Sequence, residues 1–342
     1  MSAAGLRVFE SGEGRPLDVA GIQKDLAALW KEASSAGKEP AMRASRANLI
    51  VLLEGKDPAS SGVETLIADI ASSYPSRVLL VRTAVPAAAG TLTASVSALC
   101  SLGSGARYIC CERISIDAAR GVEPSIPGTV LSLLLGDLPA VIWVPGELPL
   151  AAPWFRALVA SSDRLLIDSS FFASPGETLS ALTQMVGSLA GVDLADFEWL
   201  RLAAWRHAVA AAFDRVEARE AAREGFERVT FFEQTPSTEA SAASLLLRAW
   251  IASCVRTRSF EWHLPREGGA TSPPASDASP GGDPSRGISG ILFEGRTSTG
   301  PFRCNVPAPC TGRPLRLSDF ACLIGGQRDY PLGPAWAPSV RP

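Results

Sequence analysis

Short apolar runs separated by helical stretches begin near Arg46, and they decide what the first half of this chain can fold into. The run Val78–Val81 is apolar at successive positions, so a strand there would present apolar side chains to both faces of its sheet. Strands of this kind belong to mainly parallel sheets that helices cover on both sides. The alternation predicts strands at residues 48–53, 77–82, 107–115, 140–144 and 164–168, with helices at 63–73 and 128–135. We therefore predict a first α/β domain at residues 46–174 with a mainly parallel sheet.

The second half predicts a different α/β domain, at residues 175–325. Apolar side chains recur at steps of three and four along residues 193–223 and predict one long helix with a buried face: Trp199, Leu202, Trp205, Val209, Phe213 and Val216. Further helices are predicted at 175–189 and 241–256, and strands at 228–233, 291–294 and 302–306. We expect a mixed or antiparallel sheet packed by long helices.

The flanking segments have another composition. Residues 1–45 are rich in Gly, Ser and Pro around a helical pattern at 21–33, which predicts an N-terminal arm with a short helix. Residues 265–290 consist largely of Gly, Pro, Ser and Asp and predict a flexible insertion within the second domain. Residues 326–342 form a Pro-rich tail.

Length and composition limit the classes of function. A chain of 342 residues with 46% hydrophobic residues is long enough for two cores. A formal net charge of -3 with scattered basic residues argues against nucleic acid or an anionic membrane as a partner. No apolar run reaches the roughly 20 residues of a membrane helix, so we expect a cytoplasmic protein. The 7 cysteines are odd in number, and the adjacent Cys110 and Cys111 would bridge only with difficulty, so free thiols are expected.

Motifs for catalysis are scarce. The chain has no P-loop, and Gly103–Gly105 leads into a predicted strand instead of the helix that a dinucleotide fingerprint requires. The 2 histidines, His207 and His263, are too few for a multi-histidine metal site. Cys304 and Cys310 have no second pair at zinc-ligand spacing. We predict no catalytic residue, no cofactor and no metal.

A few polar residues near strand ends suggest ligand contacts. Asp168 follows a predicted strand, Asp137 precedes another, and Arg77 begins a third. Because open α/β sheets bind ligands at the carboxyl ends of their strands, Asp168 is a candidate contact for a phosphorylated sugar. Asp137 and Arg77 are further candidate contacts, with Arg77 on the phosphate. The alternative is that Asp168 caps a loop.

Aromatic and arginine side chains are concentrated in the predicted long helix. Trp199, Arg201, Trp205 and Arg206 lie within two turns, and Trp and Arg dominate protein–protein hot spots. These four residues, with Trp143, are the candidate partner-binding residues. The alternative is that Trp199 and Trp205 are core residues and the arginines are solvated.

A series of short strings, in this order, resembles the OpcA family of glucose-6-phosphate dehydrogenase assembly proteins between about residues 46 and 256. The strings are Arg46–Val51, Tyr74–Arg77, Cys111–Ile114, Leu134–Pro139 with Ile142–Trp143, Ala160–Leu165 with Ile167–Ser169, Trp199–Leu202 with Trp205–Arg206, and Phe213–Asp214. The sequence departs from the family pattern at Ala44–Arg46 and in the last third of the chain.

The resemblance implies a protein that is not an enzyme. It implies a role in the oxidative pentose phosphate pathway: binding to glucose-6-phosphate dehydrogenase, promotion of its active oligomer and an increase in its activity. An enzyme or sensor for a phosphorylated sugar is the alternative. Redox sensing through Cys110, Cys111 or Cys304 is a further possibility that the sequence leaves open.

Overall fold

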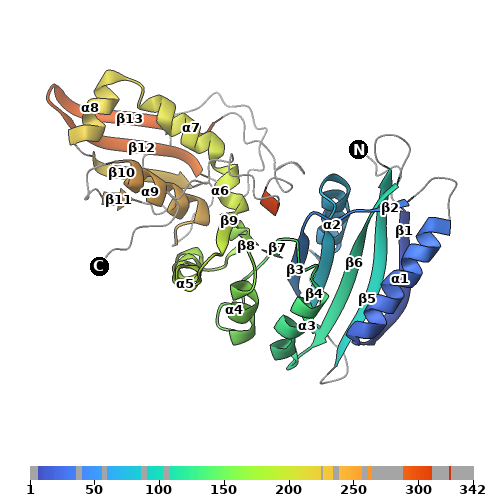
Figure 1. Ribbon diagram of the computed structural model, residues 1–342. Helices are drawn as coiled ribbons and strands as arrows, with labels where there is room; N and C mark the ends of the chain where they lie inside the picture. The colour runs from blue at the N-terminus through green and yellow to red at the C-terminus, as the bar shows by residue number, and fades with distance from the viewer. Residues whose placement is uncertain are drawn as a thin grey trace. The chain divides into compact units, whose positions relative to one another are not determined.

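The computed structural model describes the chain in ten stretches, which form two compact units that we treat separately (Figure 1). The described residues are 7–35, 41–55, 60–85, 91–102, 108–224, 226–233, 239–255, 261–263, 288–309 and 323–324. The first unit takes its residues from Met1–Phe171, Gln184–Ala195 and Arg316–Asp329. The described residues of the second unit come from Phe172–Thr183 and Asp196–Leu315.

The first unit is built on a sheet whose described strands follow the order β1-β5-β6-β4-β3-β7-β8-β9, with β2 beside β6. The strands are β1 (Arg7–Pro16), β2 (Ala41–Arg43), β3 (Asn48–Glu54), β4 (Arg77–Val85), β5 (Leu92–Leu102), β6 (Tyr108–Ala119), β7 (Ala140–Val144), β8 (Arg164–Ile167) and β9 (Asp193–Asp196). All pairs among β6, β4, β3, β7 and β8 are parallel. The prediction of a mainly parallel sheet is confirmed.

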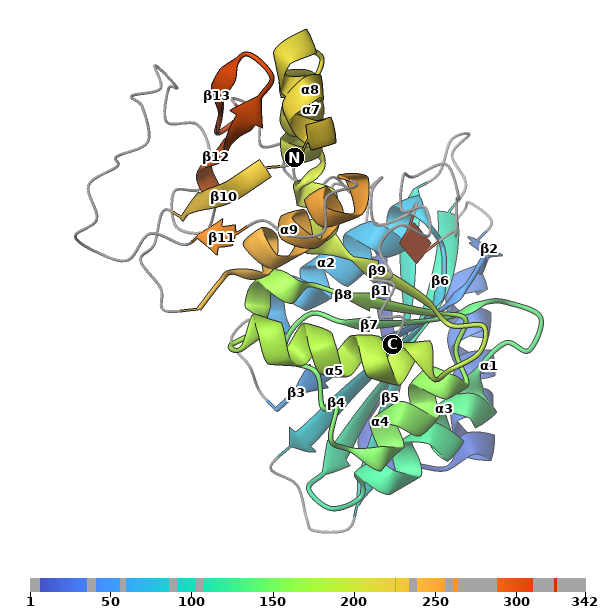
Figure 2. The ribbon, with the colours of Figure 1, turned by 90° about the vertical axis from the view of Figure 1, so that its left-hand side faces the viewer.

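Helices cover both faces of this sheet (Figure 2). They are α1 (Val19–Ser35), α2 (Ser60–Ser73), α3 (Ile126–Leu133) and α4 (Pro153–Ala160). The next helix, α5 (Pro175–Gly187), is divided between the two units at Thr183 and Gln184. On α2, Glu64 pairs with Arg113 of β6, whereas the next strand residue, Glu112, accepts a hydrogen bond from Trp30 of α1. Because successive strand side chains point to opposite faces, α1 and α2 lie on opposite sides of the sheet.

The segment predicted to be an N-terminal arm is part of the first unit. Its strand β1 pairs antiparallel with β5, and α1 buries Ile22, Leu26 and Leu29. Asp18 caps α1 by accepting hydrogen bonds from the backbone N–H groups of Ala20 and Gly21. The strand β5, which the sequence pattern did not predict, extends the sheet through an antiparallel pair with β6. The parallel core therefore continues into an antiparallel edge.

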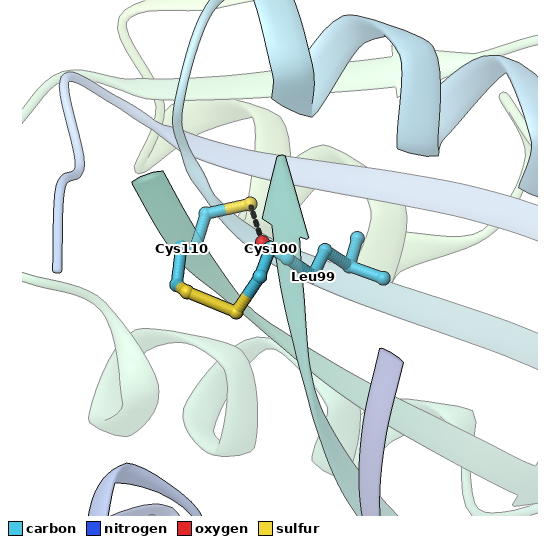
Figure 3. Close-up of a disulfide and its surroundings, with 4 residues drawn as sticks. Leu99, Cys100 and Cys110 are labelled. Atoms are coloured by element: carbon cyan, nitrogen blue, oxygen red, sulfur yellow. Dashed lines mark hydrogen bonds between the residues drawn. A yellow bond between two sulfur atoms is a disulfide. The ribbon is translucent and has the colours of Figure 1, made fainter. Parts of the chain in front are cut away.

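A disulfide joins the antiparallel pair, contrary to the expectation that all cysteines are free thiols (Figure 3). Cys100 of β5 and Cys110 of β6 are register partners, and their Cα atoms are 4.0 Å apart. Cys111 remains free, and its thiol donates to the carbonyl of Leu99 at 3.7 Å. The prediction failed because it compared the adjacent cysteines with each other, whereas the strand pairing brings Cys100 to Cys110.

Loss of this disulfide is expected to lower the free energy of unfolding by about 2 to 3 kcal/mol, because the bridge closes a loop of about ten residues and restricts the unfolded chain. Chemical denaturation with and without a reductant measures the effect. The control is a variant with serine at both positions, which should be as unstable as the reduced protein and insensitive to reductant. Equal denaturation midpoints for the oxidised and reduced protein would contradict the prediction.

The second unit holds a smaller, mixed sheet. Its described strands follow the order β11-β10-β12-β13, namely β11 (Glu261–His263), β10 (Phe226–Glu233), β12 (Ile288–Thr297) and β13 (Gly300–Pro307). β10 is parallel to β11 and antiparallel to β12, and β12 is antiparallel to β13. The sheet packs against α6 (Phe197–Arg201), α7 (Ala203–Ala212), α8 (Val216–Glu224) and α9 (Ala242–Cys254). The mixed α/β prediction is confirmed.

The single long helix predicted at residues 193–223 is wrong. Residues 193–196 are strand β9, and three short helices follow. Asp196 ends the strand and caps α6, since its carboxylate accepts the backbone N–H of Glu198 at 2.9 Å. The chain turns again after Phe213, whose ring packs against the rings of both Phe226 and Phe293. This turn moves Val216 out of the apolar stripe, and it is 69% exposed.

Two flanking predictions fall mostly outside the described residues. The predicted flexible insertion at 265–290 is described only from residue 288, where β12 begins. The predicted Pro-rich tail at 326–342 lies wholly outside the described part of the chain.

Candidate functional site

The junction between α6 and α7 brings an arginine onto a tryptophan. The guanidinium carbon of Arg206 lies 3.9 Å from the centroid of the Trp199 ring. One of its nitrogens, Nη1, donates a hydrogen bond to the Trp199 carbonyl oxygen at 2.6 Å. The stacking and the hydrogen bond hold the half-buried Arg206 side chain in one position across the helix break. We call Arg206 and Trp199 the stacked pair.

The tryptophans themselves belong to cores. Trp199 and Trp205 are 5% and 8% exposed and contribute to the hydrophobic cluster of the second unit. Trp143 is 4% exposed on β7 of the first unit. Of the two interpretations that the sequence allows for Trp199 and Trp205, the structure therefore favours the core interpretation, and the Trp143 ring is buried as well. Any partner surface here depends on the arginines.

The two arginines of the cluster differ in their partners. Arg201 donates to Glu198 at 2.8 Å, so its charge is paired within α6. Among the described residues, no carboxylate contacts Arg206, whose recorded contacts are the Trp199 ring and carbonyl. Burial without a counter-charge lowers the pKa of Arg206 to about 10, because desolvation disfavours the charged form. Arg206 is thus a fixed, partly desolvated cation that lacks an acidic partner within the described structure.

The proposed phosphate contact Arg77 is engaged in the core of the first unit. Its side chain is 3% exposed, and both Nε and Nη2 donate to Glu112 Oε2, at 2.9 and 2.6 Å. Its Nη1 donates to the carbonyl of Leu133 at 2.7 Å. Further along the same strand, Arg82 pairs with Glu64 and Asp117. Because these donors are already used, Arg77 has a structural function in this fold.

The topology separates the other two ligand candidates. Asp137 precedes the parallel strand β7, whereas Asp168 follows the parallel strand β8. The strands run in the same direction, so the two acids lie at opposite ends of the sheet. Asp168 is 6% exposed and accepts hydrogen bonds from Ser170, as expected from the loop-cap alternative. Asp137, Asp168 and Arg77 therefore do not converge on one sugar-phosphate pocket.

The remaining candidates give no assembled site in the described part of the chain. Burial raises the pKa of the Cys111 thiol to about 11, which opposes a reactive thiolate, and burial also raises the pKa of Cys304. His207 is exposed on α7. The side chain of His263, the segment Gly103–Gly105 and Cys310 lie outside what the structure describes. Within the described residues, no group of three or more His, Cys, Asp or Glu side chains could hold a metal ion, and no helix could span a membrane.

Both halves of the chain match known protein families. Residues 67–184 match the family model described as the glucose-6-phosphate dehydrogenase subunit N-terminal domain, and residues 192–292 match the corresponding C-terminal domain. The matches follow in the same order as the two units of the fold.

Curated OpcA proteins are similar over about half of this chain. The OpcA protein of Nostoc punctiforme is 32% identical over 196 residues, which cover 57% of this chain and 41% of the relative. The OpcA protein of Synechocystis sp. is 31% identical, covering 55% of this chain and 38% of the relative. The names of both refer to the OxPP cycle. The chain thus spans about two fifths of the length of the curated relatives it matches.

The similarity of this chain to a solved structure is weaker than its similarity to the curated OpcA sequences. A glucose-6-phosphate dehydrogenase in complex with glucose-6-phosphate matches with a TM-score of 0.28 and 10% identity, covering 62% of this chain and 48% of that chain. A likeness at this level does not establish a common fold, so it carries no weight here.

The structure is that of a two-unit α/β protein whose candidate site is a half-buried arginine held on a core tryptophan. The consecutive matches to both domain models then identify the family. The chain belongs to the OpcA family.

Proposed function

We propose that this chain is a non-catalytic assembly factor that binds glucose-6-phosphate dehydrogenase and promotes its active oligomer. The observation that carries the proposal is the match of both halves, in order, to the two domains that are described as parts of a glucose-6-phosphate dehydrogenase subunit. The names of the relatives, which refer to the OxPP cycle, support the same pathway. The chain would then act in the compartment of that enzyme, which we take to be the cytoplasm.

Activation by binding requires a difference in affinity. The chain must bind the active oligomer of the dehydrogenase more tightly than the inactive form, because equal affinity shifts no equilibrium. A preference of about 1.4 kcal/mol changes the ratio of the two forms about tenfold. The proposal therefore predicts that activation and oligomer size change together over one range of concentration.

The test is a titration of this chain into the glucose-6-phosphate dehydrogenase of the same organism. Initial rates of NADP reduction and the size of the dehydrogenase oligomer are recorded at each concentration. We expect a saturable rise in rate that follows a shift toward the larger oligomer. A flat rate together with an unchanged oligomer would contradict the proposal, and turnover of glucose-6-phosphate by this chain alone would contradict its non-catalytic part.

A further inference from the structure

The stacked pair offers donors that no described residue uses. A guanidinium carries five N–H donors in one plane, and Arg206 uses one nitrogen, Nη1, to donate a hydrogen bond to the Trp199 carbonyl oxygen. Among the described residues, no acceptor contacts its Nε or Nη2. We propose that Arg206, held on Trp199, is the docking point for a carboxylate side chain of the partner protein. This inference rests on the proposed function, in which that partner is glucose-6-phosphate dehydrogenase.

The geometry suits a hot spot. The Trp199 ring covers one face of the guanidinium and is itself fixed in the core of the second unit, so little side-chain entropy remains to be lost on binding. The planar fork of donors matches the two oxygens of a carboxylate. One turn further along α7, at the i+4 position, Ala210 is exposed and adds no bulk beside Arg206. A carboxylate can therefore approach without displacing a larger side chain of this helix.

The surrounding charges favour a single carboxylate over a phosphate-rich partner. The neighbouring Arg201 is neutralised by Glu198, so Arg206 is the one cation of the described α6–α7 region that lacks an acid. Nucleic acids and polyphosphates are bound by groups of cations, and the whole chain carries a formal net charge of -3. An acidic residue within a protein interface fits this isolated cation better.

The most direct variant is Arg206→Gln, which keeps a hydrogen-bond donor for the Trp199 carbonyl and removes the charge. We expect its affinity for glucose-6-phosphate dehydrogenase to fall about 30-fold, since truncating one member of a buried charge pair costs about 2 kcal/mol or more. Thermal denaturation of the free protein separates a loss of fold from a loss of binding. Arg206→Lys should recover only part of the affinity, because a lysine lacks the planar fork.

A matched pair of variants avoids any change to the stacked pair itself. Ala210 and Ala211 are adjacent, exposed residues of α7, but only position 210 lies one turn from Arg206. Ala210→Glu would place a carboxylate beside Arg206, where it neutralises the cation and repels an incoming acid. We expect about tenfold weaker binding for Ala210→Glu and a change below about threefold for Ala211→Glu, although both add the same charge.

The outcomes separate this inference from the proposed function. If the wild-type chain does not bind the dehydrogenase, the proposed function fails. If the wild-type chain binds and folded Arg206→Gln binds within threefold of it, the docking inference fails while the proposed function stands. Equal losses for Ala210→Glu and Ala211→Glu would also overturn the inference, because they would show a general effect of charge on the helix.

Discussion

Glu112→Ala is expected to lower the free energy of unfolding of the first unit by about 3 to 5 kcal/mol, because it leaves the buried Arg77 cation without a counter-charge. The side chains of Arg77 and Glu112 are 3% and 1% exposed. Glu112 also accepts hydrogen bonds from Trp30 at 2.6 Å and pairs with Arg43 at 2.9 Å. One carboxylate therefore joins α1, β2, β4 and β6, and chemical denaturation measures what its removal costs.

Asp193→Ala is the matched control for this prediction. Asp193 also pairs with an arginine of the first unit, Arg164, at 3.0 Å, but its side chain is 74% exposed. Exposed pairs contribute about 0 to 1 kcal/mol, so this variant should unfold close to wild type. The double variant Arg77→Met, Glu112→Leu should recover part of the loss, because it removes the orphaned cation. A Glu112→Ala protein within 1 kcal/mol of wild type would contradict the structural function of the buried pair.

Phe293→Ala is expected to have a comparable effect on the second unit, a loss of about 3 to 5 kcal/mol. Phe293 is 0% exposed, and its ring centroid lies 5.0 Å from that of Phe213 and 5.2 Å from that of Phe226. These rings connect β12 and β10 to the turn after α7. Truncation would leave a cavity where the sheet and the helices meet, and denaturation followed by fluorescence measures the loss.

Phe302→Ala serves as the comparison within the same sheet. Phe302 is only half-buried on β13, and its ring centroid is 6.4 Å from that of Phe226. Its removal exposes less new surface and should cost clearly less than removal of Phe293. Equal losses for the two variants would show that the cluster around Phe293 is not the centre of this core.

The strands of the parallel core were predictable from the sequence because they are apolar on both faces. The predicted strands at 48–53, 77–82, 140–144 and 164–168 correspond to β3, β4, β7 and β8. The first five residues of β3, β4 and β7 are buried, and in β8 only the first residue, Arg164, is partly exposed. The antiparallel strand β5 was not predicted because it carries hydroxyl side chains, Thr93, Ser95 and Ser97, at alternate positions. The alternation of hydroxyl and apolar side chains along β5 is the sequence signal that predicts such a strand.

At the candidate site, the sequence predicts the residue types but not which arginine lacks an acidic partner. The residue types at Trp199 and Arg206 indicated a hot spot, but burial of the ring and the half-buried position of the cation depend on the break between α6 and α7. The pairing of Arg201 with Glu198 spans three residues and can be read from helical spacing. By contrast, the partner of Arg77 lies 35 residues away in the chain. Which arginine lacks an acid therefore becomes clear only in the folded protein.

The central claim is that this OpcA family member binds glucose-6-phosphate dehydrogenase. The most direct measurement is sedimentation velocity of the labelled chain with and without the dehydrogenase of the same organism, at physiological salt. We expect the chain to sediment with the dehydrogenase oligomer, to saturate at a defined ratio and to bind about 30-fold more weakly in the Arg206→Gln variant. Sedimentation of the chain as a free species at every dehydrogenase concentration would contradict it.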